Sequence, residues 1–102
     1  METELTQIET RRNEVAQYDA NIVMYEKIVA NLPTEWPDHL IQYRGAKNEH
    51  EIAGQIENLD DVALLSQLLF ADNCRKSIRA EIMERTKAAA ILSVMETQAR
   101  PQ

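Results

Sequence analysis

Apolar residues in the first third of the chain recur with the seven-residue period of a coiled-coil helix. The a positions of this repeat are all β-branched, namely Ile8, Val15, Ile22 and Val29. The d positions follow three residues later and are Arg11, Tyr18, Tyr25 and Leu32. No Gly or Pro interrupts residues 2–31, so the pattern predicts one helix over about 2–31, roughly 45 Å long.

A helix of this length needs a partner along its apolar stripe. The β-branched a positions favour a two-stranded seam, whereas an Arg and two Tyr at d depart from a simple zipper. Pairing with a second long helix of the same chain and pairing with a second subunit both stay open, and we expect a homodimer. The predicted seam for helix pairing or dimerisation consists of Ile8, Val15, Tyr18, Ile22, Tyr25 and Val29.

The last part of the chain predicts a second long helix, over about 61–98. Its apolar residues continue at helical spacing, and no Gly or Pro occurs between Leu59 and Arg100. Asp60 is the expected N-cap. Apolar residues thin out at Asp72-Asn73-Cys74, which leaves open whether the helix kinks there.

Two short helices are expected between the long ones, one from Pro37 to Gly45 and one over residues 48–59. The chain of 102 residues has only 2 Gly and 3 Pro, which leaves little room for β-turns. The sequence therefore predicts a single all-α domain over 1–102, in which two long helices flank two short ones as a hairpin or bundle.

The charge of the chain is acidic and unevenly distributed. The net charge is −6, and residues 1–60 carry twelve acidic against five basic residues. This balance argues against general binding to a nucleic-acid backbone and suits a basic protein partner. The N-terminus has no basic region followed by an apolar one, and no apolar run approaches the roughly 18 residues of a bilayer span. With one cysteine, the chain is expected to be cytoplasmic and free of membrane.

No motif for catalysis, metal binding or cofactor binding stands out. His39 and His50 lack a metal-ligand spacing, and no Gly-rich loop is present to hold phosphates. Cys74 has no flanking residues that would activate a nucleophile and is expected to be structural. We therefore expect no enzyme activity, no metal and no cofactor.

One basic patch lies on the second long helix, at Arg75, Lys76 and Arg79. It could contact nucleic acid, which would make the chain a DNA-binding regulator. Asp72 with Lys76, and Glu81 with Arg85, are spaced as i,i+4 ion pairs. That spacing favours an ordinary solvated helix surface.

Acidic residues offer a further candidate surface. They either solubilise the protein or stand in for DNA phosphates on a DNA-handling partner. Trp36 lies in a Pro-bracketed turn and is either a lid on the core or an anchor for a partner. The candidate partner-binding residues are Glu14, Asp19, Glu26, Trp36, Asp38, Glu49 and Glu51.

Short strings in the middle of the chain resemble a known family. They are Glu26-Lys27, Leu32-Pro33, Asp38-His39-Leu40, Gly45-Ala46-Lys47, Ile52 and Asp60-Asp61-Val62. Together, over about a third of the chain, they are similar to the centre of the Gam-type host-nuclease inhibitors of bacteriophages. The resemblance implies a dimeric all-helical protein that blocks the DNA-binding site of the bacterial RecBCD nuclease.

The combined expectation is a non-enzymatic protein-binding module, most sharply an acidic helical inhibitor of a host DNA-processing complex. A small coiled-coil structural or regulatory adaptor is the alternative, and a DNA-binding regulator is less favoured.

Overall fold

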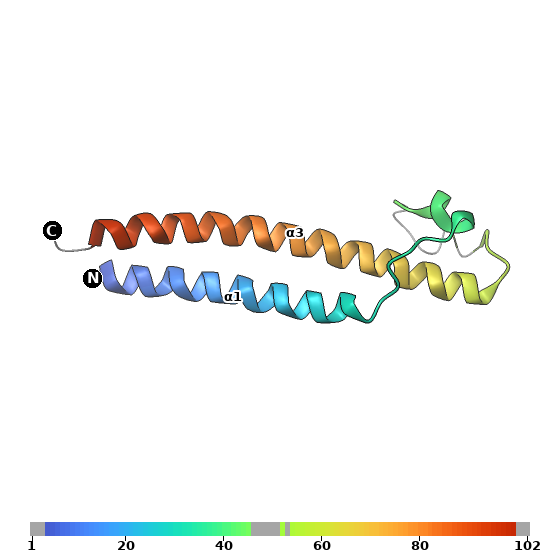
Figure 1. Ribbon diagram of the computed structural model, residues 1–102, viewed down its shortest axis with the longest axis horizontal. Helices are drawn as coiled ribbons and strands as arrows, with labels where there is room; N and C mark the ends of the chain where they lie inside the picture. The colour runs from blue at the N-terminus through green and yellow to red at the C-terminus, as the bar shows by residue number, and fades with distance from the viewer. Residues whose placement is uncertain (1–3, 46–51, 53, 100–102) are drawn as a thin grey trace.

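The computed structural model describes residues 4–45, 52 and 54–99 and has the shape of a long helical hairpin (Figure 1). Helix α1 runs over Glu4–Ala30, the 3₁₀-helix η1 over Asp38–Tyr43, and helix α3 over Leu59–Ala99. The described residues contain no strand. The all-α class and both long helices are thus confirmed, and the molecule measures 69 × 23 × 17 Å.

Helices α1 and α3 pack against each other within one chain, in antiparallel orientation (Figure 1). Three polar pairs fix their register. Arg12 contacts Glu96 at 2.9 Å, Asp19 contacts Arg85 at 2.6 Å, and the Asn21 side chain donates to Glu81 at 3.3 Å. As the residue number increases along α1, the number of the residue that it contacts on α3 decreases. The two helices therefore run in opposite directions, and both termini lie at the same end of the hairpin.

The residues of the predicted seam lie on the less exposed side of α1. Ile8 is buried, and the other five are partly buried: Val15, Tyr18, Ile22, Tyr25 and Val29. On α3 the buried residues of the middle and C-terminal parts are small, namely Ala71, Cys74 and Ala88. Small side chains at a helix contact permit a close approach of the two helix axes.

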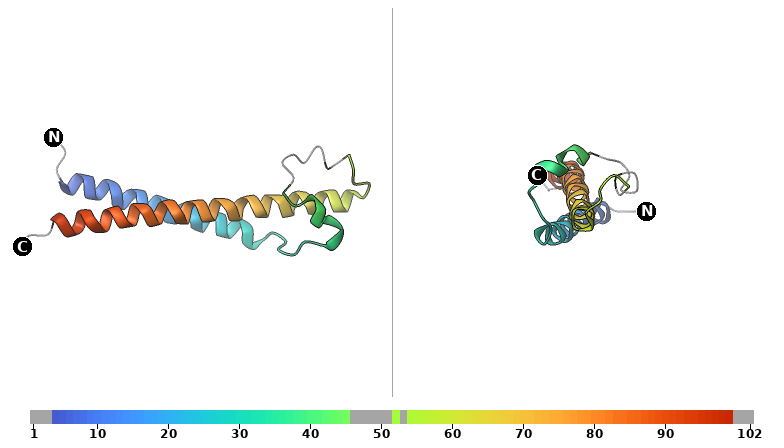
Figure 2. Two further views of the ribbon diagram at one scale, coloured as in Figure 1. Left: turned by 90° about the horizontal axis from the view of Figure 1, so that it is seen from above. Right: turned by 90° about the vertical axis from the view of Figure 1, so that its right-hand side faces the viewer.

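The main hydrophobic core lies at the end of the hairpin away from the termini, where η1 covers the first part of α3 (Figures 1 and 2). Burial of apolar side chains is the main force that holds η1 in place. The buried members are Leu40, Ile52, Leu65, Leu68 and Leu69, with Trp36, Tyr43, Ile56 and Leu64 packed around them.

The start of α3 differs from the expectation. Asn58 caps the helix: its Oδ1 accepts the Asp60 amide at 2.8 Å, and its carbonyl oxygen accepts the Val62 amide at 3.1 Å. The prediction of Asp60 as N-cap was therefore wrong. The helix begins at Leu59, one residue before Asp60, and the Asn58 side chain accepts the hydrogen bond from the Asp60 amide. Asp60 and Asp61 lie inside the first turn instead, where negative charge suits the helix dipole.

The middle of α3 and the segment between η1 and α3 can also be compared with the expectation. Helix α3 continues without interruption through Asp72-Asn73-Cys74, so there is no break at that point. Gly45 follows η1 with a φ of 92°, a conformation that other residues adopt only at a cost, and it ends the expected short helix as predicted. The third helix was expected over 48–59. Residues 48–51 and 53 lie outside the described residues. Residues 54–58, which are described, form a turn and irregular backbone, so that part of the prediction was wrong. Gly54, which is unfavourable inside a helix, lies at this turn, where the Gln55 amide donates to the Ile52 carbonyl oxygen at 2.8 Å.

Neither α1 nor α3, as described, combines the length and the apolarity that crossing a membrane requires.

Candidate functional site

Four cationic side chains from two parts of the chain line one pocket beside η1. Arg44 follows η1 directly, while Arg75, Lys76 and Arg79 project from α3. Gly45 and Asp72 complete the lining of this pocket, which has a volume of about 260 Å³. We refer to these six residues as the basic pocket.

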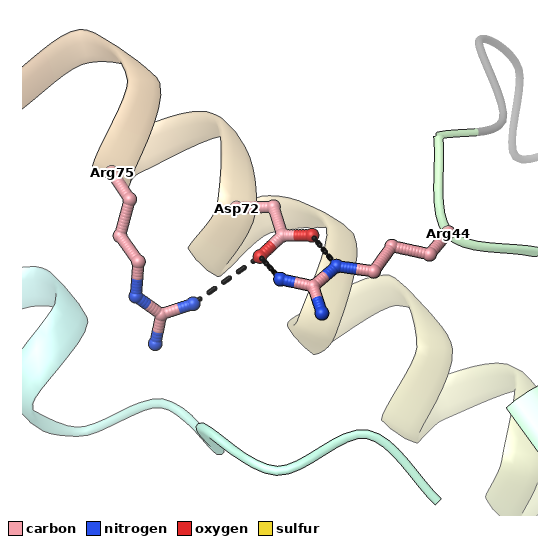
Figure 3. A network of polar contacts seen from close by, with 3 residues as sticks. All are labelled: Arg44, Asp72 and Arg75. Atoms are coloured by element: carbon pink, nitrogen blue, oxygen red, sulfur yellow. Dashed lines mark hydrogen bonds and ion pairs between the residues drawn. The ribbon is translucent and has the colours of Figure 1, made fainter. Parts of the chain in front are cut away.

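Asp72 holds two of the arginines in place (Figure 3). Arg44 donates from Nε to Asp72 Oδ2 at 3.1 Å and from an η nitrogen to Oδ1 at 3.4 Å. Arg75 donates to the same Oδ1 at 3.3 Å. A fork of charge-assisted bonds fixes the orientation of a guanidinium as well as its position, so one carboxylate organises two cations from different elements.

Trp36 holds Arg44 from another side. The guanidinium carbon of Arg44 lies 5.3 Å from the centre of the Trp36 ring, within the range of a cation–π contact. The indole itself is partly buried and packs against the hydrophobic core. Its Nε1 is buried and has no hydrogen-bond partner among the described residues.

The ion pairs on α3 are not the i,i+4 pairs that the spacing suggested. Asp72 pairs with Arg44 and Arg75 instead of Lys76, and Arg85 pairs with Asp19 on α1. Each of these long-range partners is brought close by the packing of a second element, which sequence spacing does not reveal. As a result, Lys76 and Arg79 form no ion pair with any residue that the structure describes.

The acidic residues proposed for partner binding do not gather at one place. Glu14 pairs with Arg11 at 2.9 Å, and Asp19 contacts Arg85 across the hairpin. Glu26, near the end of α1, and Asp38, at the start of η1, are exposed and form no ion pair within the described part of the chain. Glu49 and Glu51 lie outside the described residues.

The residues weighed for metal or nucleophile chemistry are scattered. His39 Nε2 lies 3.1 Å from Asp61 Oδ1 in an exposed pair, and Cys74 is a buried free thiol. Over residues 4–45, 52 and 54–99, no three His, Cys, Asp or Glu side chains converge as a metal site would need.

The fold and the basic pocket define an antiparallel helical hairpin with a cationic recess beside the first half of α3, where Arg44 reaches that helix. Comparison with protein-family models, with curated proteins and with solved structures found no match to the chain.

Proposed function

We propose that this protein is a non-enzymatic binding module that presents a long helical surface to another macromolecule. The observation that supports this most is the amount of surface left exposed. The chain exposes 7759 Å², whereas a compact monomer of this size is expected to expose about 5,900 Å². A rod with so small a core keeps much of its surface accessible to binding partners.

The sharpest form of the proposal is an inhibitor that presents carboxylates to a DNA-processing complex of a bacterial host. Glu26 and Asp38 support it, because both are exposed and form no ion pair within the described residues. The net charge of −6 would favour approach to a Lys/Arg-rich groove that normally holds DNA. The resemblance to the Gam-type inhibitors points the same way. Asp19 and Glu14, being paired internally, contribute less than the sequence suggested.

A homodimer is part of this proposal, with a second copy covering an apolar stripe on α3. Met83, Ile91 and Val94 are 60%, 44% and 56% exposed and, with exposed Ala90, share one helix face, on which the exposed Lys87 lies between Met83 and Ile91. A stable interface between two copies would have to bury roughly 1,200–2,000 Å² in total, centred on this face.

A coiled-coil adaptor is the competing function, and the same apolar stripe favours it. An adaptor would bind its partner through apolar contact, with little dependence on salt. An inhibitor that mimics phosphates would lose its partner as salt rises, because exposed charges are screened.

The test is a pull-down with tagged protein from bacterial lysate, washed at low and at high salt, with bound proteins identified by mass spectrometry. The inhibitor predicts recovery of a nuclease or another DNA-handling complex, lost at high salt and reduced by E26Q/D38N. The matched control is E57Q/E84Q, which removes two exposed carboxylates elsewhere and should leave recovery unchanged.

Recovery that withstands high salt and both double variants would favour the adaptor. Recovery of partners with no role in DNA handling would rule out the inhibitor.

A further inference from the structure

We propose that the basic pocket is a binding site for a compact phosphate-bearing small molecule, separate from any protein-binding surface. In this acidic chain the pocket brings cations from two elements together around a recess, Arg44 from the segment after η1 and the others from α3. It is independent of the proposed function, since no part of it relies on exposed carboxylates or on the apolar stripe.

The charge balance of the pocket favours an anion. Arg44 and Arg75 share a single carboxylate, that of Asp72, whose side chain is only 17% exposed. Lys76 and Arg79 add two charges that no described residue neutralises. The pocket therefore carries three positive charges in excess, in a chain whose net charge is −6.

The geometry of the arginines suits a phosphate group. A guanidinium has several N–H donors in a rigid plane and binds phosphate in bidentate fashion. Arg44 is held by Asp72 on one side and by the Trp36 ring on another, so little side-chain freedom is lost when it binds a ligand. The Asp72 bonds leave further donors of both guanidinium groups available.

The surroundings favour a compact ligand over a nucleic-acid strand. A volume of about 260 Å³ accommodates a phosphate or pyrophosphate group. Beyond the pocket the chain is acidic overall, with a net charge of −6, which disfavours an extended polyanion more strongly than a small anion that fits within the pocket.

Trp36 provides a direct reporter, because it is the only tryptophan and contacts Arg44. The experiment is a titration of the full chain with sodium pyrophosphate at constant ionic strength, followed by tryptophan fluorescence. Isothermal titration calorimetry in the same buffer measures binding whether or not the indole responds. We expect saturable binding of one pyrophosphate per pocket.

The deciding variant is K76Q/R79Q, which removes two cations that hold no described partner. Charge-assisted hydrogen bonds are strong enough that this loss should weaken pyrophosphate binding by about tenfold or more. The matched control R12Q/K87Q removes two cations that lie outside the pocket and should leave the affinity unchanged.

Three results would overturn the proposal. The first is no heat and no fluorescence change at millimolar pyrophosphate. The second is equal weakening by K76Q/R79Q and R12Q/K87Q, which would show that only net charge matters. The third is tighter binding of a 5′-phosphorylated single-stranded oligonucleotide than of pyrophosphate, which would assign the pocket to nucleic acid.

Discussion

Single leucines of α3 show how differently one residue type is used along this helix. Leu68 is 1% exposed and belongs to the core under η1, while Leu59, the first residue of the helix, is 81% exposed. The sequence shows a dense apolar run here without indicating which members turn inward. Contact with η1 decides it, because η1 covers only one side of α3.

Truncation of these two leucines should therefore have unequal effects. Leu68→Ala removes a fully buried side chain and should lower the free energy of unfolding by about 2–5 kcal/mol. Leu59→Ala makes the same chemical change at an exposed position and should stay within about 0.5 kcal/mol of wild type. Urea unfolding followed by circular dichroism measures both. Equal losses would contradict the placement of the core.

Only part of the basic pocket could be predicted from the sequence. Arg75, Lys76 and Arg79 were visible as a patch because they are neighbours on one helix. Arg44 was not, since it is separated from Asp72 by 28 residues and reaches it only after η1 has packed on α3. A candidate site built from one element can be predicted from spacing, but a site that joins two elements needs the fold.

At the scale of elements, the ends of the helices follow from local chemistry. Asn58→Ala should destabilise the protein by about 1 kcal/mol, because the amide of Asp60 loses its acceptor. Asp60→Ala should cost less, since it removes only a favourable charge from the first turn. Thermal unfolding compares the stabilities of the two variants. A larger loss of stability for Asp60→Ala than for Asn58→Ala would indicate that Asp60 is the N-cap.

The pairing of α1 with α3 can be tested through one ion pair. Asp19 and Arg85 lie 2.6 Å apart across the hairpin and are partly exposed. D19R and R85D alone should each destabilise by up to about 1 kcal/mol, because they place like charges together. The swapped variant D19R/R85D should recover most of that loss. Chemical unfolding of the four proteins gives the coupling energy, and a value of zero would contradict this register.

The long helices were predictable because the signals for them are local. The absence of Gly and Pro, together with the heptad repeat, placed α1 at about 2–31, and the structure has Glu4–Ala30. The partner of α1 was not predictable, since a heptad stripe is equally suited to a helix of the same chain and to one of another chain. The polar pairs at Arg12, Asp19 and Asn21 carry that information, and their partners lie in α3.

At the scale of the whole molecule, the chain is an elongated rod with a small core. The radius of gyration is 20.4 Å, whereas a compact domain of this length has about 13 Å. Among the described residues, α1 and α3 contain 27 and 41 residues, but only seven of these are buried. Large apolar side chains on α3 consequently stay exposed, among them Met83 and Val94.

If a second copy covers the stripe on α3, stability must depend on protein concentration. Association favours the folded state by mass action, so the melting temperature of the wild type should rise as concentration rises. M83E/V94E places charges in the stripe and should abolish this dependence and yield monomers in sedimentation velocity. V23E/M24E is the matched control, since Val23 and Met24 are about half exposed on α1, outside the stripe. A melting temperature of the wild type that is independent of concentration, with a monomeric sedimentation coefficient, would show that the hairpin folds alone and keeps its stripe for a different protein.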